Sequence, residues 1–428
     1  MVEGLSTFYG NAKPPTTLLL LTRSRSCLFT VFVCTWTVLH LNLPSRTEKY
    51  RHQFRRKLRW MLQAIMAPEF VLGFATGQKV EARRSVQRFK KAGFPNWTHR
   101  HGFYANMGGF HIELPTGSSF PINAKQLLYL IKEGYTPYPS ITEKEVWDKS
   151  KADGFQKTLT CFQTGWFIIQ VIGRAKQHLP VTTLELTTLS FVLCNLAMYI
   201  QWANKPLDVE SPTIINLRAS MEEILIRAGD DARKQWRLTP LDFIDDQSPS
   251  WLTEVQPHLR FRRGPRERPL PRFTNDRFPV IGAGPDAIIL FVVNVMYCTI
   301  HFFGWNFDFP TNIERTLWRA SCITISGCAL IFWACETYQD GVRLRRWERW
   351  YAKLAPGKAR VATMSSLEKG EREKLFIPVW EVIIMTPISL IYSLGRTYIV
   401  IEIFLSQRSL PIGAFDTVNW TDFIPHVH

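Results

Sequence analysis

The sequence lacks the cysteine patterns of a disulfide scaffold and of a zinc site. Secreted disulfide scaffolds place paired cysteines in polar loops, and zinc sites use closely spaced pairs such as C-x₂-C. Neither pattern occurs here, because every cysteine falls inside an apolar stretch. We therefore interpret these thiols as small apolar residues of helices. The 8 cysteines are Cys27, Cys34, Cys161, Cys194, Cys298, Cys322, Cys328 and Cys335.

The sequence also lacks the common motifs of nucleotide and hydrolytic sites. It contains no G-x-G-x-x-G, no P-loop, no H-E-x-x-H and no G-x-S-x-G, so we expect no cofactor and no metal ion. There is no repeat with a period of about 20–50 residues. The two halves show none of the internal similarity that is typical of carriers, which weakens a transporter function without excluding it.

Charge is missing from long runs of the chain although the whole chain is basic. Residues 186–204 and 287–307 contain no acid, lysine or arginine, and roughly 20 apolar residues suffice to cross a bilayer core. The mean hydropathy of -0.08 conceals these runs because the charges are bunched. A net charge of +16 suits either a nucleic-acid-binding protein or a membrane protein with basic cytoplasmic loops.

The apolar runs predict an all-α fold, a polytopic helical membrane protein with six to seven transmembrane helices and large basic cytoplasmic loops. Six segments are long and apolar enough to cross. They are 26–45, 155–173, 179–202, 280–306, 316–335 and 376–395, the last continuing to 405.

A seventh apolar segment, 60–78, carries Pro68 and Glu69 at its centre. A carboxylate in the middle of a bilayer costs roughly 2.5–3.5 kcal/mol on insertion scales. Strongly basic blocks at 46–59 and 79–91 flank the segment, so a crossing would carry one of them to the wrong side of the membrane. We therefore predict an in-plane or re-entrant helix at the cytoplasmic face.

With six spans, the basic segments all fall on one side, which identifies that side as cytoplasmic. The predicted organisation begins with a disordered tail over 1–25 and a first membrane region over 26–202, with a cytoplasmic loop at 79–154. A basic, proline-rich loop over 203–279, with an amphipathic helix near 216–228, precedes a second membrane region over 280–405. That region contains a cytoplasmic loop at 337–374, and 406–428 forms a lumenal tail. The basic loops need no nucleic acid to explain them.

Two N-x-T sequons test this topology. Asn96 lies in a predicted cytoplasmic loop, whereas Asn419 lies in the predicted lumenal tail. Only Asn419 is therefore expected to carry a glycan. The protein is expected in the endoplasmic reticulum or another endomembrane.

Ionisable side chains within the predicted spans are candidates for function, because such groups usually face a partner or a cavity. Glu185 lies about 9 Å along its helix from the predicted membrane boundary, counted at about 1.5 Å per residue. We expect it to pair with Arg319 or Arg396 and to line a polar cavity that opens to the lumenal half. A structural ion pair is the alternative. The candidate catalytic residues are Glu185, Arg319, Arg396 and Glu402.

Two polar stretches next to the spans are candidates for binding a substrate or an anionic lipid headgroup. The first, 97–113, has histidines at a spacing too loose to predict a metal site, and its Gly108-Gly109 pair indicates a tight turn. The second, 146–157, has lysines that could reach headgroups at the water–lipid boundary. A purely structural role is the alternative for both. The candidates are His99, His101, His111, Asp148, Lys149, Lys151, Asp153 and Lys157.

Several extended motifs resemble a large fungal family of mostly uncharacterised multipass membrane proteins. The motifs are CTWTVLHLNLP (34–44), HGFYANMGGF (101–110), DKSKAD (148–153), LPVTTLEL (179–186), NKPLDV (204–209), HFFGWNFDFP (301–310) and NWTDFIPH (419–426). The resemblance implies a membrane location. It also implies an association with gene clusters for secondary metabolites, but no catalytic residue.

These observations leave three functional hypotheses. The first is a membrane-embedded enzyme, or an accessory factor, that acts on a lipophilic intermediate of isoprenoid or polyketide type. The second is a transporter or channel for a small metabolite. The third is a non-catalytic scaffold whose basic loops bind anionic lipid headgroups or soluble partners.

Overall fold

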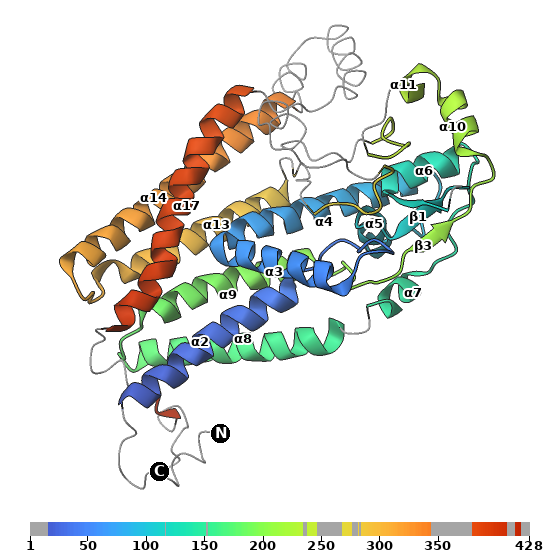
Figure 1. Ribbon diagram of the computed structural model, residues 1–428. Coiled ribbons are helices and arrows are strands. Elements are labelled where there is room, and N and C mark those ends of the chain that lie inside the picture. The colour runs from blue at the N-terminus through green and yellow to red at the C-terminus, as the bar shows by residue number, and fades with distance from the viewer. Residues whose placement is uncertain are drawn as a thin grey trace, which may run out of the picture.

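The computed structural model of the chain describes residues 16–115, 117–150, 153–233, 238–245, 268–275, 281, 284–343, 379–408 and 416–420. The first residues of the tail expected at 1–25 and most of the loop expected at 337–374 lie outside this part. The chain is mostly helical (Figure 1). Its elements are α2 (Thr16–Val38), α3 (Tyr50–Met66), α4 (Pro68–Lys91), α5 (His99–Asn106), β1 (Phe110–Glu113), β2 (Ser119–Ile122), α6 (Ala124–Lys132), α7 (Glu143–Asp148), α8 (Asp153–Lys176), α9 (Thr183–Gln201), β3 (Thr213–Ile215), α10 (Met221–Ala228), α11 (Asp230–Arg233), α13 (Pro285–Phe302), η1 (Phe303–Asn306), α14 (Asn312–Arg343), α17 (Val379–Leu405) and η3 (Ser406–Arg408).

Four helical segments within the described residues are long and apolar enough to cross a membrane. They are Thr183–Gln201, Pro285–Asn306, Asn312–Cys335 and Ile383–Arg408, and they coincide with the last four spans expected from the sequence. Helices α2 and α8 cover much of the first two expected spans, but their crossing stays a prediction. Helix α2 ends at Val38, so the helix stops before residue 45, where the expected first span ends.

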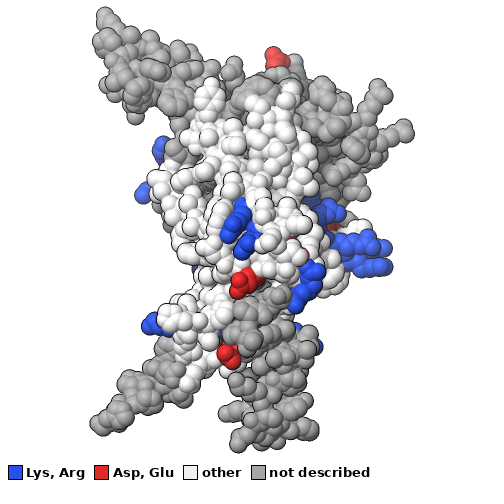
Figure 2. Space-filling view, turned by 90° about the vertical axis from the view of Figure 1, so that its left-hand side faces the viewer, with Lys and Arg blue, Asp and Glu red and all other residues white. Residues whose placement is uncertain are grey.

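Helix α9 lies in the middle of the bundle, against α2 on one side and α13 on the other (Figure 1). Helices α14 and α17 pack against each other beyond α13. Their outer surfaces expose large apolar side chains such as Ile323, Leu330, Leu390 and Leu394. The face of the molecule in Figure 2 is mostly uncharged, with lysine, arginine and acidic residues confined to small groups. Such an extended apolar surface is typical of a protein that contacts lipid.

Helices α3 and α4 lie side by side and form a hairpin (Figure 1). The chain leaves the helical conformation at Ala67, with φ -148 and ψ 72, because a proline disfavours helical backbone in the residue before it. Pro68 then occupies the first turn of α4, where its missing N–H costs nothing. The rings of Trp60 and Phe74 pack edge to face at 5.4 Å and join the two helices.

The expected all-α fold is wrong in one respect, because three short strands form a mixed sheet in the order β2-β1-β3. Strand β1 pairs antiparallel with β2 and parallel with β3, which follows about a hundred residues later. We call α5, β1, β2, α6, α7, β3 and α10 the α/β unit, which has a core of its own around Phe110, Ile112 and Ile122. Two segments expected as loops, 79–154 and 203–279, therefore contribute to one folded unit. The helix expected near 216–228 is α10.

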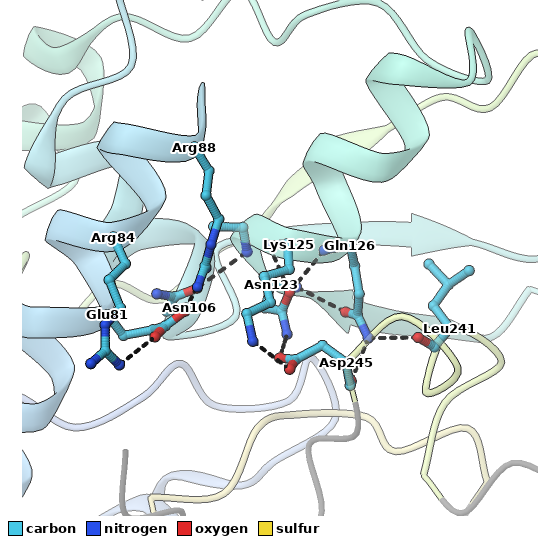
Figure 3. A network of polar contacts seen from close by, with 10 residues as sticks. Glu81, Arg84, Arg88, Asn106, Asn123, Lys125, Gln126, Leu241 and Asp245 are labelled. Atoms are coloured by element: carbon cyan, nitrogen blue, oxygen red, sulfur yellow. Dashed lines mark hydrogen bonds and ion pairs between the residues drawn. The ribbon is translucent and has the colours of Figure 1, made fainter. Parts of the chain in front are cut away.

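Polar contacts join the start of α6 to the segment that ends at Asp245, and others lie along α4 (Figure 3). Asn123 caps α6 by accepting from the backbone N–H of Lys125 and Gln126, as N-cap asparagines do. Its Nδ2 donates to Asp245 at 2.7 Å, and the Lys125 Nζ donates to the same carboxylate at 2.9 Å. On α4, Arg88 pairs with Glu81 at 2.9 Å.

Candidate functional site

A buried arginine on α17 is the centre of a polar cluster inside the helical bundle. The Arg396 side chain is fully buried. Its Nε donates to the Met66 carbonyl at 3.2 Å and its Nη2 to the Ile65 carbonyl at 3.4 Å. Its Nη1 donates to His301 at 3.2 Å. A guanidinium keeps its charge in proteins, so these groups surround a fixed positive charge.

The hairpin of α3 and α4 explains why an arginine is needed there. The last carbonyls of a helix have no partner within that helix, and the chain turns at Ala67 before α4 begins. Two of these carbonyls, of Ile65 and Met66, accept from Arg396. A cation at a helix C-terminus also interacts favourably with the helix dipole. Arg396 therefore supplies hydrogen-bond donors to the carbonyl groups at the turn of the hairpin, inside the bundle.

Glu69 supplies the carboxyl group of the cluster. It lies in the first turn of α4, and the Tyr392 hydroxyl of α17 donates to its Oε1. Arg396 is near enough to interact electrostatically with this carboxyl group. The other carboxyl oxygen, Oε2, is buried and has no hydrogen-bond partner among the described residues. A buried polar atom without a partner is uncommon in proteins and indicates a site for water or a ligand.

His301 of α13 links the arginine to α9. Because Arg396 can only donate, the His301 Nε2 must accept, so the proton of the neutral ring is on Nδ1. Nδ1 then donates to the Tyr297 carbonyl at 2.9 Å. The Ser190 hydroxyl lies 3.5 Å from Nε2. Both ring nitrogens are thus engaged, and His301 orients the guanidinium.

Aromatic rings enclose the arginine on two sides. The guanidinium carbon lies 5.0 Å from the centroid of Phe191 and 5.3 Å from that of Tyr297, within the range of cation–π attraction. Tyr297 is fully buried, and its hydroxyl has no hydrogen-bond partner among the described residues. Within the described part of the chain, the Glu69 Oε2 and the Tyr297 hydroxyl of this cluster therefore lack a hydrogen-bond partner.

The pairing predicted for Glu185 is wrong. Glu185 is buried at the start of α9, where it closes a capping box with Thr182, and its Oε1 lies 3.7 Å from the Nε of Arg174. Arg174 also donates to the carbonyls of Pro180 and Asp416. Arg174 comes from the end of α8, which the short α8–α9 connection brings close. Glu185 thus fixes a turn instead of facing the arginines of α14 and α17.

The two predicted arginines have different surroundings. Arg396 lies in the polar cluster, whereas Arg319 donates to the Trp305 carbonyl at 2.9 Å and to Asn306 at 3.2 Å. Its guanidinium lies 5.1 Å from the Trp305 ring. Arg319 therefore ties α14 to the preceding turn, and the structure does not bring it to Glu185.

Glu402 is fully buried on α17, one turn after Tyr398. The Tyr398 hydroxyl lies 2.9 Å from Glu402 Oε2 and 3.0 Å from the Glu314 carbonyl. Glu402 therefore belongs to a second polar group near the end of α17.

The histidines predicted at 97–113 lie in the α/β unit and have structural contacts. His101 caps the start of α5 and contacts the Ile141 carbonyl at 3.1 Å, and burial lowers its pKa. His111 is buried in β1, where burial and the nearby Arg46 lower its pKa to about 4. The pKa of His99 is lowered mainly by burial, and the nearby positive charges of Arg83 and Lys79 lower it further. No group of three or more His, Cys, Asp or Glu in the described part of the chain could hold a metal ion.

The candidates at 146–157 are only partly described. Asp148 is exposed at the end of α7, and the Lys149 Nζ reaches the Ser211 carbonyl at 3.4 Å. Lys151 lies outside the described residues, as do the side chains of Asp153 and Lys157 in α8.

Another buried basic residue, Lys205, lies just beyond the end of α9. Its Nζ donates to the His40 carbonyl at 2.5 Å, to Gln78 Oε1 at 2.8 Å and to Asn42 Oδ1 at 3.3 Å. These three acceptors are neutral, and burial lowers the pKa of Lys205 to about 7. Lys205 thus joins the segment after α2 to α4 and to the end of α9.

Sequence reasoning missed most of the cluster around Arg396. Glu69 appeared only as an obstacle to a span, and Tyr297 and Tyr392 lie in apolar runs without a motif. His301 begins the family motif HFFGWNFDFP, but that motif implied no function for it. One signal was available on α13. Its buried residues include Asp286, Asn294, Tyr297 and His301, which share one face at helical spacing, whereas its exposed residues are apolar except for Thr299.

The chain belongs to a family of unknown function, DUF8562, whose model matches residues 15–227 and 287–427. No curated protein and no solved structure matches the chain.

Proposed function

We propose that this member of DUF8562 is a multipass endomembrane protein that carries out acid–base chemistry on a lipophilic small molecule. In this proposal, α2 and α8 cross the membrane together with the four apolar helices, which gives six spans. The α3–α4 hairpin enters the bundle from the cytoplasmic side as a re-entrant element. The support for this arrangement is the contact between the turn of the hairpin and Arg396 of α17. Non-helical backbone at membrane depth is tolerated only where protein groups satisfy it.

One observation carries the chemical part of the proposal: two buried polar atoms of the cluster around Arg396 have no hydrogen-bond partner among the residues that the structure describes. Glu69 Oε2 is a potential proton acceptor, and the Tyr297 hydroxyl is a potential hydrogen-bond donor. Arg396 supplies a fixed positive charge that interacts electrostatically with Glu69 and lies 5.3 Å from the centroid of the Tyr297 ring. A base, a donor and a cation together suit proton transfer to or from a substrate that bears an oxygen function.

The roles of the side chains follow from their contacts. Glu69 Oε2 would take a proton from the substrate, while the Tyr392 hydroxyl holds the other carboxyl oxygen. The Tyr297 hydroxyl would donate to the substrate oxygen as that oxygen gains negative charge, and Arg396 would stabilise the charge through space. His301 orients Arg396 and does not exchange a proton, because both of its nitrogens are engaged.

Deletion of the gene in its host, with metabolite profiles of cells and medium, tests the proposal. An enzyme, or an accessory factor of one, predicts a lost product and an accumulated precursor. The accumulated precursor is expected to be an isoprenoid or polyketide intermediate of a fungal secondary-metabolite pathway. Re-expression of Glu69→Gln or Tyr297→Phe should fail to restore the product at normal protein levels, whereas Tyr398→Phe should restore it. Tyr398 is a matched control because it is a hydrogen-bonded tyrosine of α17 outside the cluster.

A carrier for a small metabolite is the second candidate, and one observation favours it. The end of α3 and the start of α4 meet inside the bundle, and broken helices of this kind form the substrate sites of many transporters. A carrier predicts that the deletion leaves the product inside the cells, with no accumulated precursor. An unchanged profile in both compartments would contradict both functions and favour a scaffold.

A further inference from the structure

The cations of α3 fall into two groups with different surroundings. On one side of the helix, Arg56 pairs with Glu48 at 2.8 Å and Lys57 with Asp208 at 3.0 Å. On the other side, Arg51, Arg55 and Arg59 are exposed. These three arginines have no ion pair or hydrogen bond within the described part of the chain. The protein therefore neutralises one set of α3 cations and leaves the other set open.

The open arginines are aligned along one face of α3. Their spacing of four residues places them in one row, about 12 Å long at about 1.5 Å per residue. Leu62 continues this face and is 54% exposed. Tyr50 and Phe54 are exposed beside the row, at 77% and 44%. We call Tyr50, Arg51, Phe54, Arg55, Arg59 and Leu62 the outer face of α3.

The outer face combines unpaired cations with exposed aromatic and aliphatic side chains. This combination is typical of a helix in the interface of a membrane, where apolar groups enter the acyl boundary and cations contact headgroups. A helix face that contacts only water rarely exposes three large apolar side chains together. A soluble acidic partner would explain the arginines but not the position of the helix.

The position of α3 selects a membrane as the occupant. The opposite face of α3 packs through Trp60, Met61 and Ala64 into a core shared with α4, α9 and α13. Its C-terminal carbonyls contact Arg396 on an apolar helix. The outer face is therefore continuous with the part of the molecule that carries the candidate spans.

We infer that the outer face of α3 binds the headgroups of anionic phospholipids. This inference rests on the membrane insertion in the proposed function but not on its chemistry. Each arginine or lysine near an anionic membrane surface contributes about 1 kcal/mol. Loss of three such contacts should weaken binding roughly a hundredfold.

Lipid titration of the purified full chain in a neutral detergent tests the inference. Phosphatidylserine and phosphatidylcholine are added in parallel, and bound lipid is counted by native mass spectrometry. The wild-type chain should prefer phosphatidylserine. The variant with Arg51→Gln, Arg55→Gln and Arg59→Gln should lose this preference roughly a hundredfold, while its weak binding of phosphatidylcholine stays unchanged. The same three positions changed to lysine should retain most of the preference.

A matched control removes the same charge elsewhere. Lys90, Lys91 and Lys144 are exposed residues of α4 and α7 at the α/β unit, so their replacement by glutamine should leave the lipid preference intact. An equal loss in this control would show attraction by total charge only and would overturn the inference. Unchanged phosphatidylserine binding in the arginine variant would also overturn the inference. It would favour an acidic protein as the partner of the outer face of α3. Neither outcome bears on catalysis, because the titration needs no turnover.

Discussion

Replacement of Arg396 by methionine should be among the most destabilising single changes in the helical bundle. The substitution keeps a side chain of similar length but removes the guanidinium. The carbonyls of Ile65 and Met66 and the Nε2 of His301 would then lose their donor. The Glu69 carboxyl group would lose its nearby positive charge.

The expected magnitude follows from these losses. A buried polar group left without its partner costs about 1–3 kcal/mol, and three buried acceptors lose their donor here. The groups share one donor, so their costs do not add fully. We expect a loss of about 3–5 kcal/mol for Arg396→Met, less than the full sum over the three acceptors. The stability of Arg396→Lys should lie between those of the wild type and Arg396→Met. A lysine keeps the positive charge, but its ammonium group lacks the planar fork that serves three separated acceptors.

Unfolding of the purified protein in mixed micelles, followed by tryptophan fluorescence, measures this loss. Arg319→Met is the matched control, because Arg319 lies in the candidate span of α14 and its contacts among the described residues are with its local turn. That control should cost only about 1 kcal/mol, the net value of an exposed hydrogen bond.

A double-mutant cycle with Glu69→Gln isolates the electrostatic coupling. In the Arg396→Met background, Glu69 has no cation to balance, so Glu69→Gln should cost less than in the wild type. The reasoning would be refuted by an Arg396→Met protein within about 1 kcal/mol of the wild type. Additive effects of the two changes would refute the coupling as well.

Three further predictions concern other parts of the chain. Gly109→Ala should destabilise the α/β unit by about 1–3 kcal/mol, because a Cβ there would lie 2.6 Å from the Tyr104 ring; Gly154→Ala, with no atom within 4 Å of its Cβ, is the control in thermal unfolding. Asn419 is exposed, and a glycosidase should shift the mobility of the wild type but not of Asn419→Gln; a shift that persists in Asn419→Gln but is lost in Asn96→Gln would contradict the topology. The folded-state pKa of Lys205, about 7, lies below its ordinary value of 10.5, so the unfolded state binds more protons between these values and stability should rise with pH from 7 upward. Lys205→Met should flatten that rise in unfolding measured at pH 7 to 9, and an equal slope in both proteins would contradict it.

The sequence predicted the apolar helices far better than the pairing between them. Runs without charge set the approximate position of α9, α13, α14 and α17, because about 20 apolar residues have few other uses. The partner of Glu185 depends on how neighbouring helices are rotated, which no run of residues reports. The local pattern Thr182-x-x-Glu185 is nevertheless a capping-box signature. It would have placed Glu185 at a helix start.

The α/β unit was missed for a different reason. Its strands have only three or four residues, too few for alternation to appear in a sequence. The central strand also pairs with β3, which lies about a hundred residues away. Basic composition identified both segments as loops, although buried residues such as Phe110 and Ile122 give them a core.

The same physical argument that excluded 60–78 as a span explains its actual structure. A carboxylate and a proline inside an apolar segment are costly when lipid surrounds them. The chain breaks at Ala67 and turns back, and the polar groups of that turn need partners within the protein. A hairpin that enters a bundle therefore requires a complementary charge on a distant helix, and Arg396 supplies it. An arginine in one span and a Pro-Glu pair in another apolar segment are thus best read together, since each accounts for the cost of the other.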